Sequence, residues 1–223
     1  MILEKNKVQS TIHTKEILLP VMESFYTLQG EGFHSGRAAY FIRLAGCDVG
    51  CVWCDVKESW DATLHPKFSV ETIVKNATKE IAQAVTDKTT KPIIVITGGE
   101  PLLYNLNELT KAFQDKGFET NIETSGSSPL SGYWNWICVS PKKFKTPLKE
   151  VVAQAHELKV VIFNKHDFKW AETHAALTNK NCKLFLQPEW DKREMITPLI
   201  VDYIKTHPQW QLSIQTHKYI NVP

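Results

Sequence analysis

Cys47, Cys51 and Cys54 lie within eight residues of one another, in the run FIRLAGCDVGCVWCD that spans residues 41–55. Thiolates at this spacing converge on one metal centre more easily than they pair as disulfides. We also expect no secretory signal, because the polar N-terminal residues lack an apolar core. A zinc ion or one iron–sulfur cluster takes four ligands, so three cysteines leave one position for another group. The loop therefore predicts a metal centre, and a structural zinc site completed by His65 or another residue remains an alternative.

The spacing C-x3-C-x2-C, with the aromatic Trp53 directly before the last cysteine, resembles the cluster loop of the radical S-adenosylmethionine (SAM) enzymes. The resemblance implies that the three cysteines hold a [4Fe-4S] cluster, and that the amino and carboxylate groups of SAM bind the iron that lacks a protein ligand. That iron must be open because SAM has to touch the metal to receive an electron. The resemblance further implies an external electron donor such as flavodoxin or ferredoxin.

The composition is that of an ordinary globular domain. The chain has 223 residues, of which 43% are hydrophobic and 22% are charged, and its formal net charge is +2. This length suits one α/β domain, and the charge gives no reason to expect a nucleic acid or a membrane as partner. No apolar run approaches the roughly 20 residues that span a bilayer. We therefore expect a cytoplasmic protein that acts on a small molecule.

Apolar spacing predicts strands that alternate with helices along most of the chain. We expect residues 1–20 to form an N-terminal extension and residues 21–223 to form a single domain. The alternation predicts an α/β fold with a mostly parallel sheet, arranged as an open, partial (β/α) barrel of the radical SAM type. The predicted strands cover residues 39–44, 93–96, 119–123, 136–139, 160–163, 183–186 and 211–215. The predicted helices cover residues 70–85 (with Ser69 as N-cap), 106–116, 148–158, 169–177 and 194–206.

Polar and glycine-rich segments follow several of these strands, at the sheet edge where α/β proteins bind ligands. The segment TGGEP at residues 97–101 contains two glycines, which permit close approach of the backbone to a ligand. Arg43 interrupts an apolar strand and needs a partner or a pocket, unless it faces the edge of an alternating strand. The other polar residues at strand ends, each also typical of a plain turn or cap, are Glu123, Ser125, Ser140, Lys142 and Gln187.

Eight motifs in order extend the resemblance to one family of radical SAM enzymes. LQGEG, FIRLAGC, CxWCD, ITGGEP, ETSG, SPK, LQP and QTHKYIN together resemble the 7-carboxy-7-deazaguanine synthases of queuosine biosynthesis, a tRNA modification pathway, from about Met22 to Pro223. The resemblance implies a lyase that acts on a free pterin, 6-carboxy-5,6,7,8-tetrahydropterin. Cleavage of SAM gives a 5′-deoxyadenosyl radical that abstracts a hydrogen atom from C6. Ring contraction with loss of ammonia then gives 7-carboxy-7-deazaguanine, and SAM is re-formed.

The same resemblance assigns residues of this chain to two sets of contacts and implies a homodimer. The set implied for the pterin, with Arg43 on its carboxylate, is Leu28, Gln29, Gly30, Glu31, Arg43, Thr97, His217 and Pro223. The set implied for SAM is Trp53, Asp55, Gly99, Glu100, Ser125, Ser140, Pro141, Lys142 and Gln187.

One position departs from the pattern of that family. The family usually has a threonine that binds Mg²⁺ two residues after the third cysteine, but residue 56 is valine, which cannot bind a hard cation. We expect weak or absent stimulation by Mg²⁺, unless Asp55 or Ser59 holds the ion together with substrate and water. A rival hypothesis is an activase that places a glycyl radical on a protein partner. That class shares the cysteine loop and TGGEP, but not LQGEG and QTHK.

Overall fold

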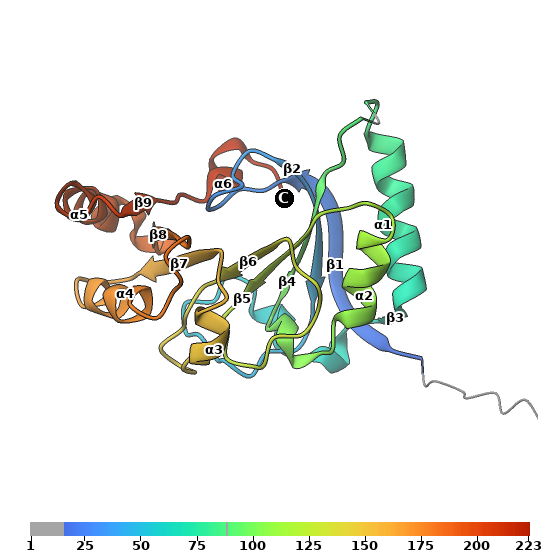
Figure 1. The fold of residues 1–223 in the computed structure, drawn as a ribbon, viewed down its shortest axis with the longest axis horizontal. Helices are drawn as coiled ribbons and strands as arrows, with labels where there is room; N and C mark the ends of the chain where they lie inside the picture. The colour runs from blue at the N-terminus through green and yellow to red at the C-terminus, as the bar shows by residue number, and fades with distance from the viewer. Residues whose placement is uncertain (1–15, 88) are drawn as a thin grey trace, which may run out of the picture.

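The computed structural model describes residues 16–87 and 89–223, which form a sheet of nine strands (Figure 1). The strand order is β3-β1-β2-β4-β5-β6-β7-β8-β9, with β3 and β9 at opposite ends, so the sheet is open. Strand β1 is antiparallel to its neighbours, and the order from β2 to β9 is parallel. The strands are β1 (Leu18–Leu28), β2 (Ala38–Leu44), β3 (Lys67–Ser69), β4 (Ile93–Gly98), β5 (Thr120–Thr124), β6 (Trp136–Val139), β7 (Glu157–Ile162), β8 (Lys183–Pro188) and β9 (Trp210–Leu212). The predicted α/β fold with an open, mostly parallel sheet is confirmed.

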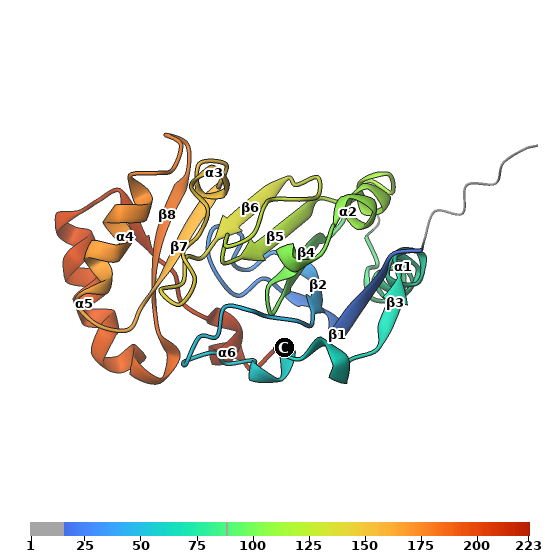
Figure 2. The same ribbon diagram turned by 90° about the horizontal axis from the view of Figure 1, so that it is seen from below.

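Helices connect most of the parallel strands. They are α1 (Val70–Ala84), α2 (Asn107–Gln114), α3 (Lys149–Val152), α4 (Asp167–Ala175), α5 (Arg193–Thr206) and α6 (Thr216–Ile220). The 3-10 turns are η1 (Lys57–Ser59), η2 (Ala62–Leu64), η3 (Pro101–Leu103) and η4 (Trp190–Lys192). In Figure 2, α3 and α6 lie on opposite sides of the sheet, and the C-terminus lies beside α6. None of the described helices is long and apolar enough to cross a membrane.

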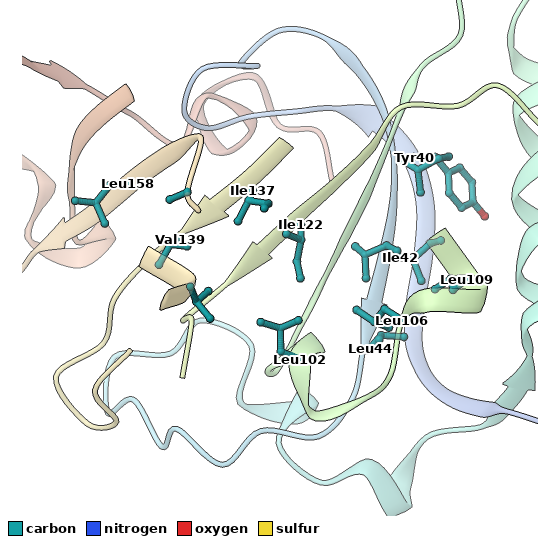
Figure 3. Packing of buried hydrophobic residues seen from close by; sticks show 14 of the residues in the cluster. Tyr40, Ile42, Leu44, Leu102, Leu106, Leu109, Ile122, Ile137, Val139 and Leu158 are labelled. Carbon is teal, nitrogen blue, oxygen red and sulfur yellow. The ribbon is translucent and has the colours of Figure 1, made fainter. Parts of the chain in front are cut away.

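The main apolar core lies between the sheet and the helices that cover it (Figure 3). Strand alternation explains this arrangement, because successive side chains point to opposite faces of a sheet. Ile42 of β2 belongs to the main core together with Leu106 beside α2, whereas Ala39 belongs to a second, small cluster with Ile93 and Val95 of β4. The second cluster lies on the other face of the sheet, because Ala39 and Ile42 are an odd number of positions apart on β2 and point to opposite faces.

The first long helix forms as predicted. The side-chain oxygen of Ser69 accepts a hydrogen bond of 3.3 Å from the backbone N–H of Thr72, so Ser69 is the N-cap of α1. The helix buries its apolar face, which consists of Ile73, Val74, Ala77 and Ile81.

The structure differs from the prediction between residues 148 and 163. We expected a helix over residues 148–158, but α3 contains only Lys149–Val152 and β7 already begins at Glu157. In β7, the apolar Leu158 is fully buried on one face while the neighbouring Glu157 and Lys159 are buried on the other. Charged residues at alternate positions hid a strand that is buried on both faces, and the strand predicted at 160–163 therefore begins three residues earlier.

The two ends of the predicted domain also need correction. Residues 18–20, which we placed in the N-terminal extension, pair with residues 67–69 of β3 and belong to the sheet. The expectation for residues 1–15 lies outside the described residues. The strand predicted at 211–215 is the shorter β9, and a helix that the prediction lacked, α6, follows it.

Candidate active site

A cavity of about 470 Å³ lies at the carboxyl ends of the parallel strands, where the sheet, the cysteine loop and the C-terminal segment meet. This volume suits a small-molecule ligand. The predicted site residues that line it are Leu28, Gln29, Gly30, Glu31, Arg43, Cys47, Cys51, Trp53, Cys54, Asp55, Thr97, Gly99, Ser125, Ser140, Lys142, Gln187, His217 and Pro223. Glu100 and Pro141 are not among the lining residues. The structure thus gathers nearly all of the predicted residues in one place, and their individual roles remain predictions.

The cysteine loop is held by backbone hydrogen bonds at its start and by the TGGEP turn beside it. Gly46 N donates to Ser59 O at 2.6 Å, and Cys47 N donates to Trp60 O at 3.1 Å. On the other side, Glu100 N donates to Gly46 O at 2.8 Å. A Cβ atom at Gly99 would lie 2.3 Å from Gly46 O and 2.7 Å from the Cβ of Cys47. The TGGEP turn therefore needs glycine at position 99 because it packs directly on the backbone that carries Cys47.

The three thiols share one end of the cavity but are not placed to bind a single metal ion. Burial raises the pKa of Cys47 and raises that of Cys51 to about 11. Among the described residues, no group of three His, Cys, Asp or Glu side chains has the geometry to hold one ion. Zinc bonds of about 2.3 Å would draw such ligands close together, whereas each cysteine of a [4Fe-4S] cluster binds a different iron. The arrangement therefore favours a cluster over a zinc ion.

His65, the residue proposed to complete a zinc site, is engaged elsewhere. Its Nε2 lies 2.8 Å from the carbonyl oxygen of Glu58, and the side chain does not line the cavity. The zinc alternative thus lacks its expected fourth ligand.

Glu100 does not face the cavity, contrary to our expectation for SAM binding. Its side chain is 1% exposed, and both carboxylate oxygens accept hydrogen bonds from the protein. Oε1 accepts from Leu102 N at 3.0 Å and from Thr124 Oγ1 at 2.5 Å, while Oε2 accepts from Ser125 N at 2.9 Å and from Ser125 Oγ at 2.5 Å. Glu100 thus ties the TGGEP turn to the end of β5. Sequence alone could not show this because the donors come from a neighbouring strand.

On the side of the cavity near the cysteines, Lys142 supplies a positive charge. Its Nζ donates to Ser140 Oγ at 2.7 Å and lies 5.1 Å from the centre of the Trp53 ring. Burial lowers the pKa of Lys142. This cluster joins the cysteine loop to the segment after β6, as expected for residues that share one ligand.

Arg43 points into the cavity from β2 and is held by Glu23. Its Nε donates to Glu23 Oε1 at 2.6 Å, and it makes no other hydrogen bond with the described residues, so both terminal guanidinium nitrogens remain for a ligand. Pairing of β1 with β2 shifts register between Val21 and Glu23, and this irregularity places Glu23 opposite Arg43. The arginine thus faces the cavity with a fixed orientation, and the alternative of an edge-facing arginine is not supported.

The cavity also contains a charged network whose central residue, Lys159, sequence analysis missed. Lys159 of β7 forms ion pairs with Glu31 and with Glu123, the latter at 3.1 Å. Gln215 Nε2 donates to Glu31 Oε1 at 2.8 Å, and Gln29 Nε2 donates to Glu123 Oε1 at 2.8 Å. The sequence signal that could have found Lys159 was its charge next to the apolar run of residues 160–162, a signal similar to the one that marked Arg43.

The C-terminal segment closes the cavity over the Gln29–Gly32 turn. Thr216 N donates to Gly30 O at 2.9 Å, and a Cβ atom at Gly30 would lie 2.1 Å from His217 Nδ1. At the chain end, Thr27 Oγ1 donates to Pro223 O at 3.2 Å. Gly30 is therefore required for close packing of His217, whose pKa is lowered by burial.

Comparison with known proteins agrees with this geometry. The family model described as "Radical SAM superfamily" matches residues 41–161. A 7-carboxy-7-deazaguanine synthase from Flavobacterium psychrophilum is 56% identical over 206 residues, which cover 92% of this chain and 93% of that protein. The chain belongs to the 7-carboxy-7-deazaguanine synthase family. Proteins of the same name from Synechocystis sp. and Escherichia coli are 46% and 35% identical, over 91% of this chain and 93% and 98% of theirs.

A solved structure that matches is the crystal structure of QueE from Escherichia coli, with a TM-score of 0.76 at 33% identity, covering 90% of this chain and 95% of that chain. Membership of the 7-carboxy-7-deazaguanine synthase family sets aside the glycyl-radical activase hypothesis. The 56% identical relative covers 92% of this chain, which is more than the residues 41–161 that the superfamily model matches. The Gln29–Gly32 turn and the segment around His217 lie outside residues 41–161.

Proposed function

We propose that this chain converts 6-carboxy-5,6,7,8-tetrahydropterin to 7-carboxy-7-deazaguanine, with loss of ammonia. The observation that carries the proposal is the composition of the cavity at the carboxyl ends of the strands. One end holds the three cysteines, and the rest of the lining holds Arg43 and the amide and carboxylate side chains around Lys159. A small heterocycle with a carboxylate substituent matches this combination of a guanidinium and hydrogen-bonding groups.

Different residues of the chain would bind and orient different parts of the pterin. Arg43, fixed by Glu23, binds the carboxylate of the pterin through its free nitrogens. The Gln29–Gly32 turn and His217 would lie against the ring, and the backbone hydrogen bond from Thr216 to Gly30 holds these two segments together. Thr97 and Pro223 complete the lining.

Cys47, Cys51 and Cys54 fit a [4Fe-4S] cluster, and the residues that would hold SAM beside it line the same cavity: Trp53, Asp55, Gly99, Ser125, Ser140, Lys142 and Gln187. When bound, the cluster and SAM supply the 5′-deoxyadenosyl radical that begins the reaction. The glycine contact at position 99 keeps Cys47 in place, and Ser213 Oγ donates to Gln187 Oε1 at 2.8 Å and fixes the amide. These residues thus set the distance between the radical source and the pterin.

The geometry around Val56 supports our expectation of weak Mg²⁺ dependence. Val56 lines the cavity where a threonine ligand would stand. Ser59 Oγ donates to Val56 O at 2.7 Å, and Asp55 Oδ2 accepts from Lys218 Nζ at 3.2 Å. Both residues that we considered as replacement ligands are therefore engaged with the protein.

We further propose that the protein acts in the cytoplasm as a homodimer on a free pterin, without nucleic acid or membrane as partner. A small electron-transfer protein such as flavodoxin or ferredoxin would supply the electron that the cluster requires. The balanced net charge of +2 supports the exclusion of nucleic acid.

The test is mass spectrometry of products after anaerobic cluster reconstitution and incubation with SAM, a strong reductant and 6-carboxy-5,6,7,8-tetrahydropterin. We expect 7-carboxy-7-deazaguanine from the wild-type protein and none from Cys51→Ala. Cleavage of SAM without this product would preserve the radical chemistry and refute the substrate assignment.

A further inference from the structure

Lys159 is a buried cation between two carboxylates that open into the cavity. Its side chain is 4% exposed, and those of Glu31 and Glu123 are 15% and 23% exposed. Lys159 comes from β7, Glu123 from β5 and Glu31 from the turn after β1, so the three residues reach one point from separate parts of the fold. The group lies in the cavity lining rather than in the apolar core.

The two carboxylates retain capacity to accept hydrogen bonds. Each Oε2 accepts from Lys159, while Glu31 Oε1 accepts from Gln215 and Glu123 Oε1 accepts from Gln29. Within the described residues, each of the four oxygens therefore accepts one hydrogen bond. Because an ionised carboxylate oxygen can accept about two, each has room for a ligand N–H. Gln29 is fixed in turn, because its Oε1 accepts from Glu31 N at 3.0 Å.

The charges around this group keep the Glu31 carboxylate ionised. Burial alone would raise the pKa of Glu31, but attraction to Lys159 and hydrogen bonds from Lys159 and Gln215 outweigh it and lower the pKa to about 2. Burial would lower the pKa of Lys159, but Glu123 and Glu31 raise it well above its ordinary value, with smaller contributions from Cys138 of β6 and Glu157 of β7.

Other charged groups nearby do not change the net charge of Lys159, Glu31 and Glu123. His217 of α6 faces Glu31, and Lys142 is close enough to be affected by both Glu31 and Lys159. With one lysine between two glutamates, the group carries a net charge of about −1 and presents acceptors only. It thus suits a ligand that offers neutral N–H donors and disfavours one that offers oxygen acceptors.

We propose that Lys159 determines substrate specificity by holding Glu31 and Glu123 as paired, ionised acceptors for the N–H edge of the pterin ring. This inference rests on the proposed function, because a pterin carries a ring N–H and an exocyclic amino group on one edge. Lys159 is a positioning residue, since it acts through the two carboxylates. Without its charge the carboxylates would repel each other, and one would take up a proton and become a donor.

The experiment is anaerobic calorimetric titration of the reconstituted holoenzyme, with SAM present, using two stable ligands. Pterin-6-carboxylic acid has an amino donor at C2, and lumazine-6-carboxylic acid has a carbonyl acceptor there. We expect the wild-type protein to bind the pterin at least about tenfold more tightly, the effect of one mismatched buried polar group. Lys159→Met should lose this preference, whereas Lys111→Met, which removes an exposed lysine paired with Asp115 on α2, should keep it.

The pH dependence separates positioning from a merely structural role. Wild-type affinity for pterin-6-carboxylic acid should be the same at pH 6 and pH 8. The affinity of Lys159→Met should fall at pH 6, because burial raises the pKa of carboxylates that have lost their cation. Lys159→Met combined with Glu123→Gln restores the net charge of the group and removes the repulsion between the two carboxylates, so its affinity should fall less at pH 6 than that of Lys159→Met. Cluster absorbance and SAM binding show whether each variant is folded, and Lys159→Arg, which keeps the cation, should keep the ligand preference.

Several results would overturn the inference. If Lys159→Met retains the tenfold preference for the pterin ligand, Lys159 has only a structural role. The same conclusion would follow if folded Lys159→Arg lost that preference. A wild-type protein that binds both ligands equally would show that the carboxylates do not read this edge, with the pterin assignment intact. A wild-type protein that binds neither ligand would refute the proposed substrate class itself.

Discussion

Replacement of Gly99 by alanine should damage the metal centre without touching a metal ligand. The added Cβ atom would lie 2.3 Å from Gly46 O and 2.7 Å from the Cβ of Cys47. Ordinary contacts are about 3.5 Å, so the two backbones must separate by roughly 1 Å. Such overpacking costs about 1–3 kcal/mol. The shift also strains the hydrogen bonds Gly99 N to Leu44 O and Glu100 N to Gly46 O, which cross the same contact.

The expected result is a lower cluster content, because metal–ligand distances tolerate only about 0.2 Å. Cluster content is measured as iron and sulfide per chain after anaerobic reconstitution. The rate of SAM cleavage in the absence of substrate is measured on the same samples. Gly30→Ala is the matched control, since its Cβ atom meets the His217 side chain at 2.1 Å and not the cysteine loop. It should retain iron and SAM cleavage but lose turnover of the pterin. Full iron content and normal SAM cleavage in Gly99→Ala would refute the reasoning.

Three further predictions concern the substrate side and the missing magnesium ligand. Glu23→Gln should raise KM for the pterin about two- to fivefold in steady-state assays and retain kcat, because a partly exposed ion pair contributes about 0.2–1 kcal/mol. The control is Glu119→Gln, which breaks the ion pair with Arg37 and should leave KM unchanged. Chelation of Mg²⁺ should barely change the wild-type rate, and Val56→Thr should create a dependence; a large stimulation of the wild-type protein would contradict this. In the folded protein the pKa of Glu31 is about 2, below its ordinary value of 4.5. The ionised carboxylate therefore contributes about 3 kcal/mol to the free energy of unfolding. This contribution is complete above pH 5 and is lost as the pH falls towards 2. Urea midpoints at pH 5 and pH 3 should therefore differ more in the wild-type protein than in Glu31→Gln.

Sequence reasoning located the features that depend on short spacing or on one unusual residue. The three cysteines fall within eight residues, and their convergence at one end of the cavity follows from that spacing alone. Arg43 inside an apolar strand required a partner, and the structure supplies Glu23 on one side and the cavity on the other. Strand ends were predicted well enough to bring Ser125, Ser140 and Gln187 to the same edge of the sheet.

What sequence reasoning missed depends on contacts between strands that are distant in the chain. Glu100 was expected in the cavity, but Thr124 and Ser125 of the adjacent strand supply donors that turn it inward. Lys159 was overlooked because it fell between the helix predicted over residues 148–158 and the strand predicted over residues 160–163, whereas it belongs to β7. Their orientation is set by pairing with β6 and β8, in a register that the local pattern does not contain.

The two sides of the cavity differ in how much of the chain is needed to build them. The loop that carries the cysteines is held by Ser59 and Trp60, which are close in sequence, and by the turn at Gly99 after β4, the strand that pairs with β2. The substrate side joins the two ends of the chain: Gly32 N donates to Ser213 Oγ at 3.0 Å, and Thr27 Oγ1 reaches Pro223. Closing so long a loop costs more entropy than forming local contacts, so the substrate side requires the complete sheet. Perturbations of the Gly30 contact should therefore leave the metal centre intact, which is why Gly30→Ala and Gly99→Ala are expected to separate SAM cleavage from turnover of the pterin.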